Sequence, residues 1–596
     1  MILQALSDYY RRKCDDPDPA QHLPLFGLEQ KEIPFILEIT AEGELLQLRD
    51  TRELLGKKKV ARVFRVPMSV KRASNVAANL LWDNAEYVLG VPDAKKLEEN
   101  QKKGKEGEYR ERLQQMQAMF LARIQALSAT ALEDAGVVAV LKFLQSAHTE
   151  SLQRQPGWAD VLASNPVLTF RLHGDLDLVC QRPAVVQAAL SAAGADDAPQ
   201  AMCLVTGEHA PVERLHASIK GVWGAQTSGA NIVSFNARAF ESYGKTERQG
   251  ENAPVSRVAA FAYTTALNHL LRKDSVQRMQ VGDASTVFWA ERQDPFETIF
   301  GDIFQDNPDG GTTAVRALLD AVYSGQWGES DENLRYHVLG LAPNAARISI
   351  RFYHCITLSE LGQRIVQHFE DLSLARGPHD PQYPSLFRLL TAVALQNKAD
   401  HIPPNLGGAI VDALLAGPDA PYPSLWLNAA VGRCRAEQNV NYLRAAAIKA
   451  CLNRYIRFRQ STEKEFLPML DLSNTHPAYR LGRLFAVLEK IQEEASPGLN
   501  ATIRDRYYGA ASSTPVAVFT TLLRLKNAHL KKLMPGRVTV FEKLLGEVLG
   551  PVDDFPKHLP LPDQGRFALG YYHQRQDFFT RKSQDTDHGT PEGETA

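Results

Sequence analysis

The sequence predicts an α+β protein: a mixed α/β N-terminal region with short sheets, followed by an all-α C-terminal region that ends in a helical bundle. Two patterns predict this fold class. Short apolar and β-branched runs alternate with amphipathic stretches up to residue 354, and helical periodicity continues almost throughout after about residue 358. Because 596 residues exceed the size at which one core keeps growing, we expect several domains. The expected divisions are a mixed α/β region, a helical region and a C-terminal helical bundle, over 1–355, 356–468 and 469–596.

The N-terminal region carries the strand signals. Residues 33–49 are typical of two strands joined by a turn at Glu42 and Gly43, and residues 60–66 of a strand ended by Pro67. An amphipathic helix follows, with apolar residues at helical spacing: Leu113, Met116, Phe120, Ile124 and Leu127. The later elements expected here are a hairpin over 166–183 turning at Gly174 and Asp175, an alanine-rich helix, a strand over 201–205 and a last strand over 346–354.

The C-terminal region is expected to pack as a bundle. Pro and Gly clusters break its helical periodicity at 377–384, 403–408 and 417–423. Three later segments each place apolar residues on one face, and short connections favour burial of those faces against one another: 477–494, 515–533 and 538–549. The polar stretch from about residue 582 is expected to be disordered.

Composition limits the class of protein. No apolar run reaches the roughly 20 residues that a membrane helix needs, and the N-terminus lacks the features of a signal peptide, so we expect a cytoplasmic protein. The six cysteines form no CxxC pair, which argues against a disulfide framework and a zinc knuckle. A formal net charge of -2 gives no global electrostatic reason to bind nucleic acid, so such binding would depend on local patches.

Two basic segments stand out because apolar and aromatic residues are interleaved with their cations. Residues 57–72 (KKKVARVFRVPMSVKR) contain no acid. Residues 439–460 contain none either, and their cations are Arg444, Lys449, Arg454, Arg457 and Arg459. A charge run is most often a solvated face, and that alternative stays open for both segments.

The loop GAQTSG at 224–229 raises the question of a nucleotide-phosphate site. A P-loop needs G-x-x-x-x-G-K-[ST], but Ala230 and Asn231 stand where Lys and Ser or Thr are required. A second near miss, GKT at 244–246, lacks its first glycine because Ala239 occupies that position. Neither segment is expected to bind a nucleotide.

Metal and nucleophile patterns are equally weak. His379 and Asp380 lie in a proline-bounded turn without a matching helical His. Cys203, His209 and His216 are poorly spaced for zinc, and no G-x-S-x-G elbow is present. The sequence therefore gives no positive case for an enzyme, a cofactor or a metal site.

Several segments, in order along most of the chain, carry a resemblance to a known family. They are KRASNVAANLLWDNAEYVLG (71–90), CLVTGEHAPVERLHASIKGVWGAQTSGANIVSFNARAFESYGKT (203–246), NAPVSRVAAFAYTTALNHLL (252–271), TVFWAE (286–291), LAPNAARISIRFYH (341–354) and RAAAIKACLNR (444–454). Together they resemble the large subunit of type I-C CRISPR surveillance complexes (Cascade), whose members assemble with guide RNA and bind target DNA.

The resemblance implies a DNA-binding subunit without catalytic activity. Its 1–355 region would recognise the short protospacer-adjacent motif (PAM) beside the target, and the subunit would assist duplex opening, stabilise the R-loop and recruit the helicase-nuclease. The implied partners are crRNA-containing Cascade, with its backbone subunits, crRNA-processing subunit and small subunits, and target double-stranded DNA with its displaced strand. The resemblance also implies that the C-terminal helical region can be made separately from an internal start as the small subunit. Met469 is the candidate start, and the alternative is an ordinary core or linker methionine.

Candidate PAM-reading side chains occur first in the turn after Pro67 and the helix expected to follow it. Phosphate contacts fix position, whereas Asn, Gln, Arg and Lys at groove edges discriminate bases. The candidates are Lys71, Arg72, Ser74, Asn75 and Asn79. The alternative is structural: Asn75 would cap a helix and Asn84 would end one.

The loop at 224–229 is the second candidate. Its small residues permit close backbone approach, and its polar side chains suit a DNA groove, so the candidates are Lys220, Gln226, Thr227 and Ser228. By analogy with other large subunits, Gln226 would act as a wedge between separating strands. The alternative is a tight turn without a ligand, ahead of a strand over 231–235.

Contacts with the DNA backbone are expected from cations in the basic segments and on the bundle: Lys57, Lys58, Lys59, Arg444, Lys449, Arg454, Arg457, Arg524, Lys526 and Lys531, with Lys532 beside them. For the bundle cations, the alternative is a solvated helix end favoured by the macrodipole. Two other functions stay open: a metal-dependent nuclease or RNA-processing enzyme of the same defence system, and a scaffold that contacts only proteins.

Overall fold

The computed structural model describes residues 1–18, 21–55, 58–70, 72, 76–146, 149–194, 199–242, 244–245, 249–304, 308–327 and 330–586. The chain forms two compact units. The first comprises Leu3–Ala217 and Ser234–Ala266, and the second comprises Ser218–Val233 and Leu267–Ala596. Small sheets and helices alternate up to β14, and only helices follow it in the described part of the chain, which confirms the predicted fold class.

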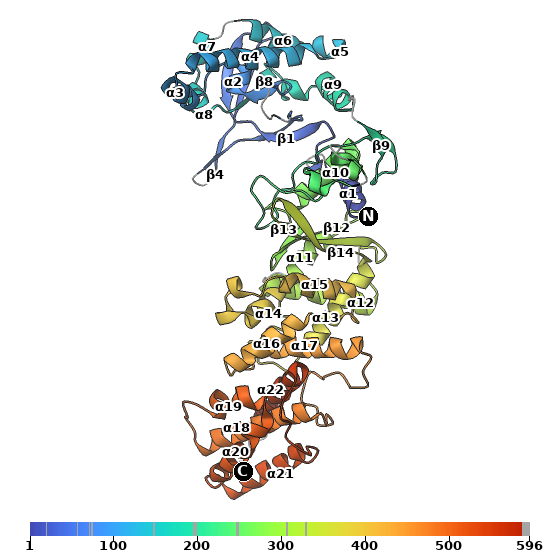
Figure 1. Cartoon of the computed structure of the whole chain (residues 1–596), viewed down its shortest axis with the longest axis vertical. Helices are drawn as coiled ribbons and strands as arrows, with labels where there is room; N and C mark the ends of the chain where they lie inside the picture. The colour runs from blue at the N-terminus through green and yellow to red at the C-terminus, as the bar shows by residue number, and fades with distance from the viewer. Residues whose placement is uncertain are drawn as a thin grey trace, which may run out of the picture. The chain divides into compact units, whose positions relative to one another are not determined.

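The first unit is built around a four-stranded sheet in the order β3-β2-β8-β7. β2 and β8 run parallel, with Phe35 opposite Leu168, and the other neighbours are antiparallel. Phe120 of α4 and Phe143 of α6 both pack on Phe170 of β8, with ring centroids 6.5 and 5.6 Å apart. The sheet core is therefore closed by these two helices (Figure 1).

The strands and helices of the first unit are short. The strands are β1 Leu28–Glu32, β2 Phe35–Ile39, β3 Leu45–Asp50, β4 Glu53–Leu55, β5 Lys58–Val60, β6 Val63–Pro67, β7 Trp82–Asn84, β8 Val167–Leu172, β9 Gln200–Met202 and β10 His209–Pro211. The helices are α1 Ile2–Cys14, α2 Ala85–Val88, α3 Ala94–Lys102, α4 Glu106–Gln125, α5 Ala129–Leu132, α6 Ala135–Gln145, α7 Thr149–Gln153, α8 Trp158–Ser164, α9 Pro183–Gly194 and α10 Arg257–Leu270, whose last residues belong to the second unit. β2, β3, β6 and α4 confirm the predicted elements.

The predicted hairpin over 166–183 is wrong. Only its first strand forms, as β8, and after the turn at Gly174 the chain enters a 3-10 turn at Val179–Gln181. β8 is a central strand, paired with β2 on one side and β7 on the other. A returning strand therefore has no free edge to pair with.

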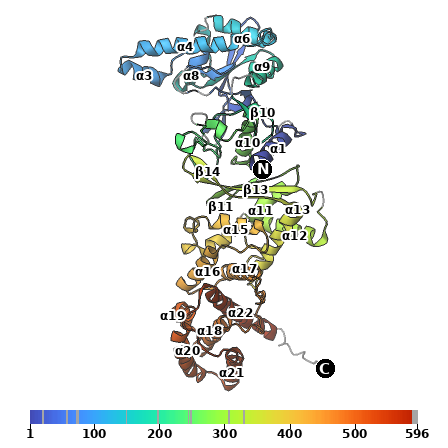
Figure 2. The same ribbon diagram turned by 45° about the vertical axis from the view of Figure 1, so that its right-hand side comes forward.

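The second unit contains an antiparallel sheet in the order β11-β12-β13-β14, followed by helices (Figure 2). Its strands are β11 Arg278–Val281, β12 Ala284–Ala290, β13 Arg335–Asn344 and β14 Arg347–Thr357. β14 confirms the last predicted strand. The strand predicted over 231–235 does not form; Asn231 makes only a single bridge with Arg347 at the edge of the sheet.

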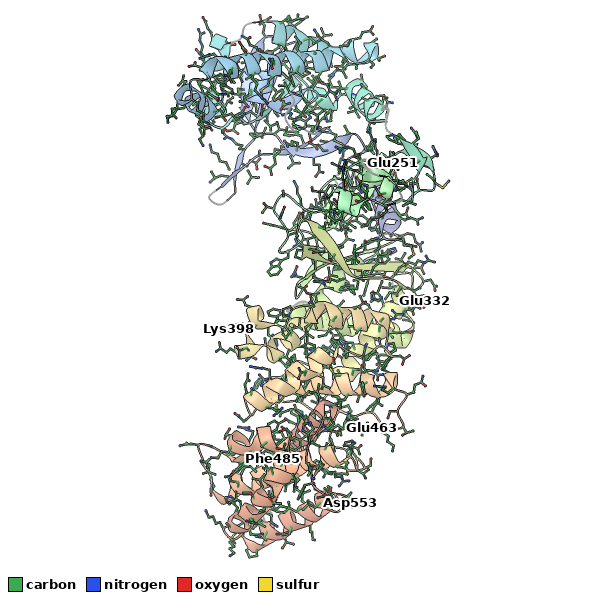
Figure 3. All side chains as sticks on the ribbon, in the orientation of Figure 1. Glu251, Glu332, Lys398, Glu463, Phe485 and Asp553 are labelled. Atoms are coloured by element: carbon green, nitrogen blue, oxygen red, sulfur yellow. The ribbon has the colours of Figure 1, made fainter. Side chains whose placement is uncertain are left out.

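The helices of the second unit share one continuous apolar core with this sheet. They are α11 Phe296–Phe304, α12 Pro308–Ser324, α13 Leu358–Leu372, α14 Leu386–Val393, α15 Leu406–Ala416, α16 Ser424–Ala436, α17 Tyr442–Phe458, α18 Pro477–Ala495, α19 Ile503–Ala511, α20 Pro515–Leu530, α21 Pro535–Leu549 and α22 Leu561–Thr586. α18, α20 and α21 confirm the three predicted bundle helices. Phe485 of α18 lies inside the bundle, against Tyr508, Phe519 and Phe567 (Figure 3).

α22 is the helix that joins the bundle to the helices before it. Two glycines let it approach α18 closely, because a Cβ at Gly482 would lie 2.0 Å from the Phe567 carbonyl oxygen and one at Gly570 2.0 Å from that of Tyr479. α22 also packs against α16 and α17, and the Tyr572 hydroxyl donates to the Ala375 carbonyl at 2.7 Å. The bundle therefore shares a core with the helical region that precedes residue 469.

Candidate nucleic-acid interface

The segment 219–230, named here the glycine loop, is closed at its neck by backbone pairing. Ile219 and Ala230 exchange two N–H to O=C hydrogen bonds of 2.8 and 2.9 Å. The next residue, Asn231, accepts a hydrogen bond of 3.0 Å from the Ile348 N–H of β14. The Lys220 N–H donates to the Asn268 side-chain oxygen of α10 at 2.7 Å. The loop is thus tied to the edge of the sheet and to the end of α10.

Three glycines of the loop have positive φ, and the surroundings explain two of them. Gly221 has φ 89°, and a Cβ there would lie 2.6 Å from the Leu271 carbonyl oxygen. Gly229 has φ 94°, and its Cβ would lie 2.8 Å from the Ser218 Cβ. These two glycines are required by packing within the protein itself. Gly224, at φ 77°, has more room, since its Cβ would meet only Pro343 at 3.3 Å.

The glycine loop carries four side chains that the sequence predicts to contact DNA. Lys220, Gln226, Thr227 and Ser228 are all exposed, and a turn in which the Gly229 N–H donates to the Gln226 carbonyl at 2.9 Å shapes the tip. Among the described residues, no hydrogen bond or ion pair engages these four side chains. They are therefore available to a ligand.

The glycine loop also carries Trp223, a residue that the sequence analysis does not single out. Its side chain is 62% exposed. A signal was present in the sequence: a large aromatic residue stands between Gly221 and Gly224, in a stretch without helical or strand periodicity. Bulky apolar residues outside such periodic patterns are not explained by a core.

The turn after Pro67 is only partly described: Lys71, Ser74 and Asn75 lie outside the described residues. Arg72 forms an ion pair with Asp83, donates to the Ala77 carbonyl at 2.6 Å and lies 4.1 Å over the Tyr87 ring. Its guanidinium is therefore already engaged in holding this turn.

Asn79 does not suit the predicted base-reading role. It is 5% exposed, and its side-chain oxygen accepts from the Val70 N–H at 3.0 Å. The Asn79 N–H in turn donates to Asp83 at 2.9 Å, so Asn79 is a structural residue of the turn. Asn84 is also structural, but it begins a helix and does not end one, because its side chain accepts from the Tyr87 N–H as the N-cap of α2.

The first basic segment lies partly on the β4–β5 hairpin. Lys57 is outside the described residues, and Lys58 and Lys59 belong to β5, where Lys59 is opposite Leu54. Lys59 is exposed. Its predicted contact with a DNA backbone stays a prediction.

The second basic segment forms α17, and the structure corrects its predicted role. Arg444, Lys449 and Arg454 are buried, with exposures of 1%, 2% and 0%. Each donates to backbone carbonyls of neighbouring segments: Arg444 to Ala392, Lys449 to Glu370 and Asp371, and Arg454 to Ala413, Gly417 and Ala420. The prediction that these three cations track phosphates is wrong, because none of them reaches the surface.

Asp371 of α13 is the centre of this buried charge cluster. Its carboxylate accepts from Arg454 Nε at 3.0 Å and from Arg457 Nη2 at 2.7 Å. Arg457 also pairs with Glu465 at 2.6 Å, so its charge is balanced inside the protein. Burial lowers the pKa of Lys449 to about 8. The cluster stabilises contacts among helices and is not a surface for DNA.

The bundle cations differ from those of α17. Arg524, Lys531 and Lys532 are exposed, and among the described residues no ion pair engages them. Lys526 pairs with Glu542 of α21 at 3.1 Å. The end of α20 therefore offers unpaired positive charge.

The weak metal candidates form no cluster of ligands in the described part of the chain. Among the described residues, no three His, Cys, Asp or Glu side chains are grouped to hold a metal ion. Cys203 accepts from the Ser256 and Val205 N–H groups; burial raises the pKa of its thiol, but hydrogen bonds from Ser256 and Thr206 outweigh this and lower the pKa to about 7. His216 is instead hydrogen-bonded to the Tyr263 hydroxyl at 2.6 Å.

Comparisons with known proteins bear on the chain as a whole. The sequence model of the family described as CRISPR-associated protein (Cas_Csd1) matches residues 6–579. A comparison with curated proteins finds no match. Within the described part of the chain, no helix is both long and apolar enough to cross a membrane.

Proposed function

The chain belongs to the CRISPR-associated Cas_Csd1 family, the large subunit of type I-C Cascade, and from this we propose that it holds and reads target DNA in such a complex. In this proposal it recognises the PAM, assists duplex opening, stabilises the R-loop and recruits the helicase-nuclease. Its partners are the crRNA-containing backbone, the crRNA-processing subunit and the small subunits. The observation that carries the proposal is the glycine loop, whose backbone is tied to α10 and β14 and whose four polar side chains are exposed and make no hydrogen bond or ion pair with the described residues.

The chemistry of the loop suits this role. In an RNA-guided complex, base pairing reads the target sequence, so the protein needs few base-reading groups beside it. Gln226 offers both a donor and an acceptor to a base edge, and Lys220 offers one cation to a phosphate. The hydroxyls of Thr227 and Ser228 can donate to phosphate oxygens or to bases.

Other described cations support phosphate contacts elsewhere on the chain. Lys59 on β5, Arg524 in α20 and Lys531 directly after α20 are exposed. Each phosphate contact releases counterions, so together they should make binding fall steeply with salt. Arg72 has less to offer, since its guanidinium is held by Asp83 and Ala77.

The separate small subunit is part of the same proposal. Met469 is 64% exposed and lies in the connection between α17 and α18, ahead of the first bundle helix. A start there would deliver α18 to α22 as one product. Changing Met469→Leu should abolish a short product detected with an antibody to the C-terminus, whereas the control Met534→Leu, also at an exposed methionine, should leave it.

The direct test is binding of the reconstituted complex to target duplexes that carry each flanking trinucleotide, across a salt series. Gln226→Ala should reduce discrimination between flanks, since a good bidentate contact is worth about 1–3 kcal/mol. Lys220→Ala should weaken all targets alike and make the salt slope shallower by about one. The controls are Gln114→Ala and Lys398→Ala, two exposed positions outside the loop. A native complex that ignores the flanking sequence would refute the PAM-reading role.

A further inference from the structure

Trp223 is exposed in a way that no other tryptophan of this chain is. All six tryptophans are among the described residues, and Trp82, Trp289 and Trp426 are buried, while Trp158 and Trp327 are half-buried. Trp223 is 62% exposed, and among the described residues its indole makes no ring contact or hydrogen bond. Leaving so large an apolar surface in water is unfavourable, so such a side chain indicates a partner.

The backbone holds Trp223 in this outward position. Its N–H donates to the Ser285 hydroxyl at 2.9 Å, and Ser285 is itself fully buried in β12 and bonded to Gln280 at 3.0 Å. The preceding residue, Val222, is buried, and the following Gly224 has a positive φ that an ordinary residue rarely adopts. The backbone that carries the indole is therefore anchored to the sheet, and the indole can contact a ligand without a large rearrangement of the loop.

The surroundings of the indole suit a nucleic acid better than a protein surface. Residues 218–236 contain no acidic side chain, and Lys220 is exposed three residues before Trp223. On the other side of the indole along the chain, the exposed side chains at the tip of the loop are polar, Gln226 and Thr227. An aromatic ring beside a cation and hydrogen-bonding groups is the combination that binds unpaired nucleotides.

We propose that Trp223 stacks on an unpaired base of the target DNA beside the point where the duplex opens. This inference rests on the proposed function, since it takes opened DNA as the ligand of the glycine loop. Stacking needs no particular base, because every base has a π face. Trp223 would therefore hold one opened nucleotide without adding to sequence discrimination, while Gln226 reads the flanking pair.

The test compares the complex containing Trp223→Phe, Trp223→Leu and Trp223→Ala with the native complex. The targets are a full duplex and a duplex whose first target base pairs are mismatched, each with 2-aminopurine at the opened positions. Trp223→Ala and Trp223→Leu should raise the Kd of both targets by about 5- to 150-fold, the range that corresponds to one lost base stack. Trp223→Phe should stay within about 5-fold of native, because it keeps an aromatic face. The native and Trp223→Phe complexes should quench the fluorescence of 2-aminopurine at one position. The Trp223→Leu and Trp223→Ala complexes should not quench it.

Two controls separate stacking from other effects. Phe387→Ala removes an aromatic side chain that is 45% exposed on α14 and should change neither Kd nor quenching. All Trp223 variants should have the same unfolding temperature as the native protein, because an exposed indole contributes little to the core.

Three results would overturn the inference. Trp223→Leu equal to Trp223→Phe would mean a merely apolar contact. A loss confined to the full duplex would mean that the indole acts on paired DNA. If all three variants bound DNA and quenched 2-aminopurine as the native complex does, Trp223 would not contact DNA. In each of these cases the native complex still discriminates between flanking sequences, so the proposed function stands. A native complex that does not discriminate between them refutes the proposed function, and the quenching data then show on their own whether Trp223 stacks on a base.

Discussion

Removing the charge of Asp371 tests whether the cations around it are structural. Asp371 is 2% exposed, and its carboxylate is bound by Arg454 and Arg457. Asp371→Asn keeps the shape of the side chain but leaves the buried Arg454 guanidinium without a carboxylate. The asparagine amide would also point N–H groups at the guanidinium groups of Arg454 and Arg457, which have no atom that can accept a hydrogen bond. The expected result is destabilisation of the contact between α13 and α17.

The structure sets the size of the effect. Breaking a buried ion pair from one side costs about 3–5 kcal/mol, because an uncompensated charge remains buried. Arg454 keeps hydrogen bonds to the Ala413 and Gly417 carbonyls at 2.9 and 3.0 Å, and it lies 4.1 Å over the Tyr422 ring. These remaining contacts place the expected loss at the lower end, about 3 kcal/mol, or roughly a hundredfold in the opening equilibrium.

Amide hydrogen exchange is the suitable measurement, because a chain with two compact units need not unfold in one step. Protection of the α17 amides should fall by roughly a hundredfold in Asp371→Asn. The matched control is Asp553→Asn at an exposed aspartate of the bundle (Figure 3), for which protection should stay native. Unchanged α17 protection in Asp371→Asn would refute the structural interpretation.

The same variant also separates the two interpretations of α17 in DNA binding. If Arg454 and Arg457 contacted phosphates, removing the carboxylate between them would strengthen target binding at low salt and steepen its salt dependence. Because Arg454 is fully buried, the structure instead predicts an unchanged salt slope for complexes that remain folded. A steeper slope would contradict the burial of this cluster.

Three further predictions concern the loop, the buried lysine and the bundle. Gly221→Ala should lower amide protection in the glycine loop more than Gly174→Ala lowers it around its own turn: both have φ near 90°, but only at Gly221 would the Cβ meet a carbonyl oxygen at 2.6 Å, and equal effects would contradict the packing argument. Burial lowers the pKa of Lys449 to about 8 from 10.5, so the unfolded chain binds more protons between these values and the unfolding free energy should rise with pH across that window; urea titrations of Lys449→Met should lack this rise, whereas the exposed control Lys398→Met should keep it. A fragment of residues 469–596 should self-associate in ultracentrifugation, because it exposes the face of α22 that packs on α16 and α17, and Tyr572→Arg should reduce that association; a stable monomeric fragment would be the contrary result.

The sequence predicts the fold where one periodicity dominates. β2, β6 and β14 follow from apolar and β-branched runs, and α18, α20 and α21 follow from one-sided apolar faces. The error at 166–183 has a different origin: the local turn signal at Gly174 is real, since its φ is 88°, but the strand before it already has two neighbours. Pairing in a sheet is decided by distant segments, and a local pattern does not contain that information.

The site is less predictable than the fold. Lys220 and Gln226 are correctly placed on an exposed loop, because small polar residues between glycines are typical of surface turns. Asn79 shows the limit of residue type as evidence: the same amide that suits a base edge also suits the Val70 N–H, and burial decides between them. Trp223 shows the reverse: its apolar residue type suggests a core position, and only the lack of helical or strand periodicity around it indicates an exposed one.

The spacing of the cations on α17 explains why this helix cannot offer them to one phosphate chain. Arg444, Lys449 and Arg454 are five residues apart, and at about 100° per residue each step turns roughly 140° around the helix axis. Three cations that point in three directions need three different partners, and α17 has them, since it packs against α13, α14, α16 and α22. The charged side chains of a helix surrounded in this way form hydrogen bonds and ion pairs inside the protein. The salt dependence of DNA binding should therefore come from exposed positions such as Lys220 on the glycine loop, Arg524 on α20 and Lys531 directly after it, where no ion pair within the described part of the chain competes with a phosphate.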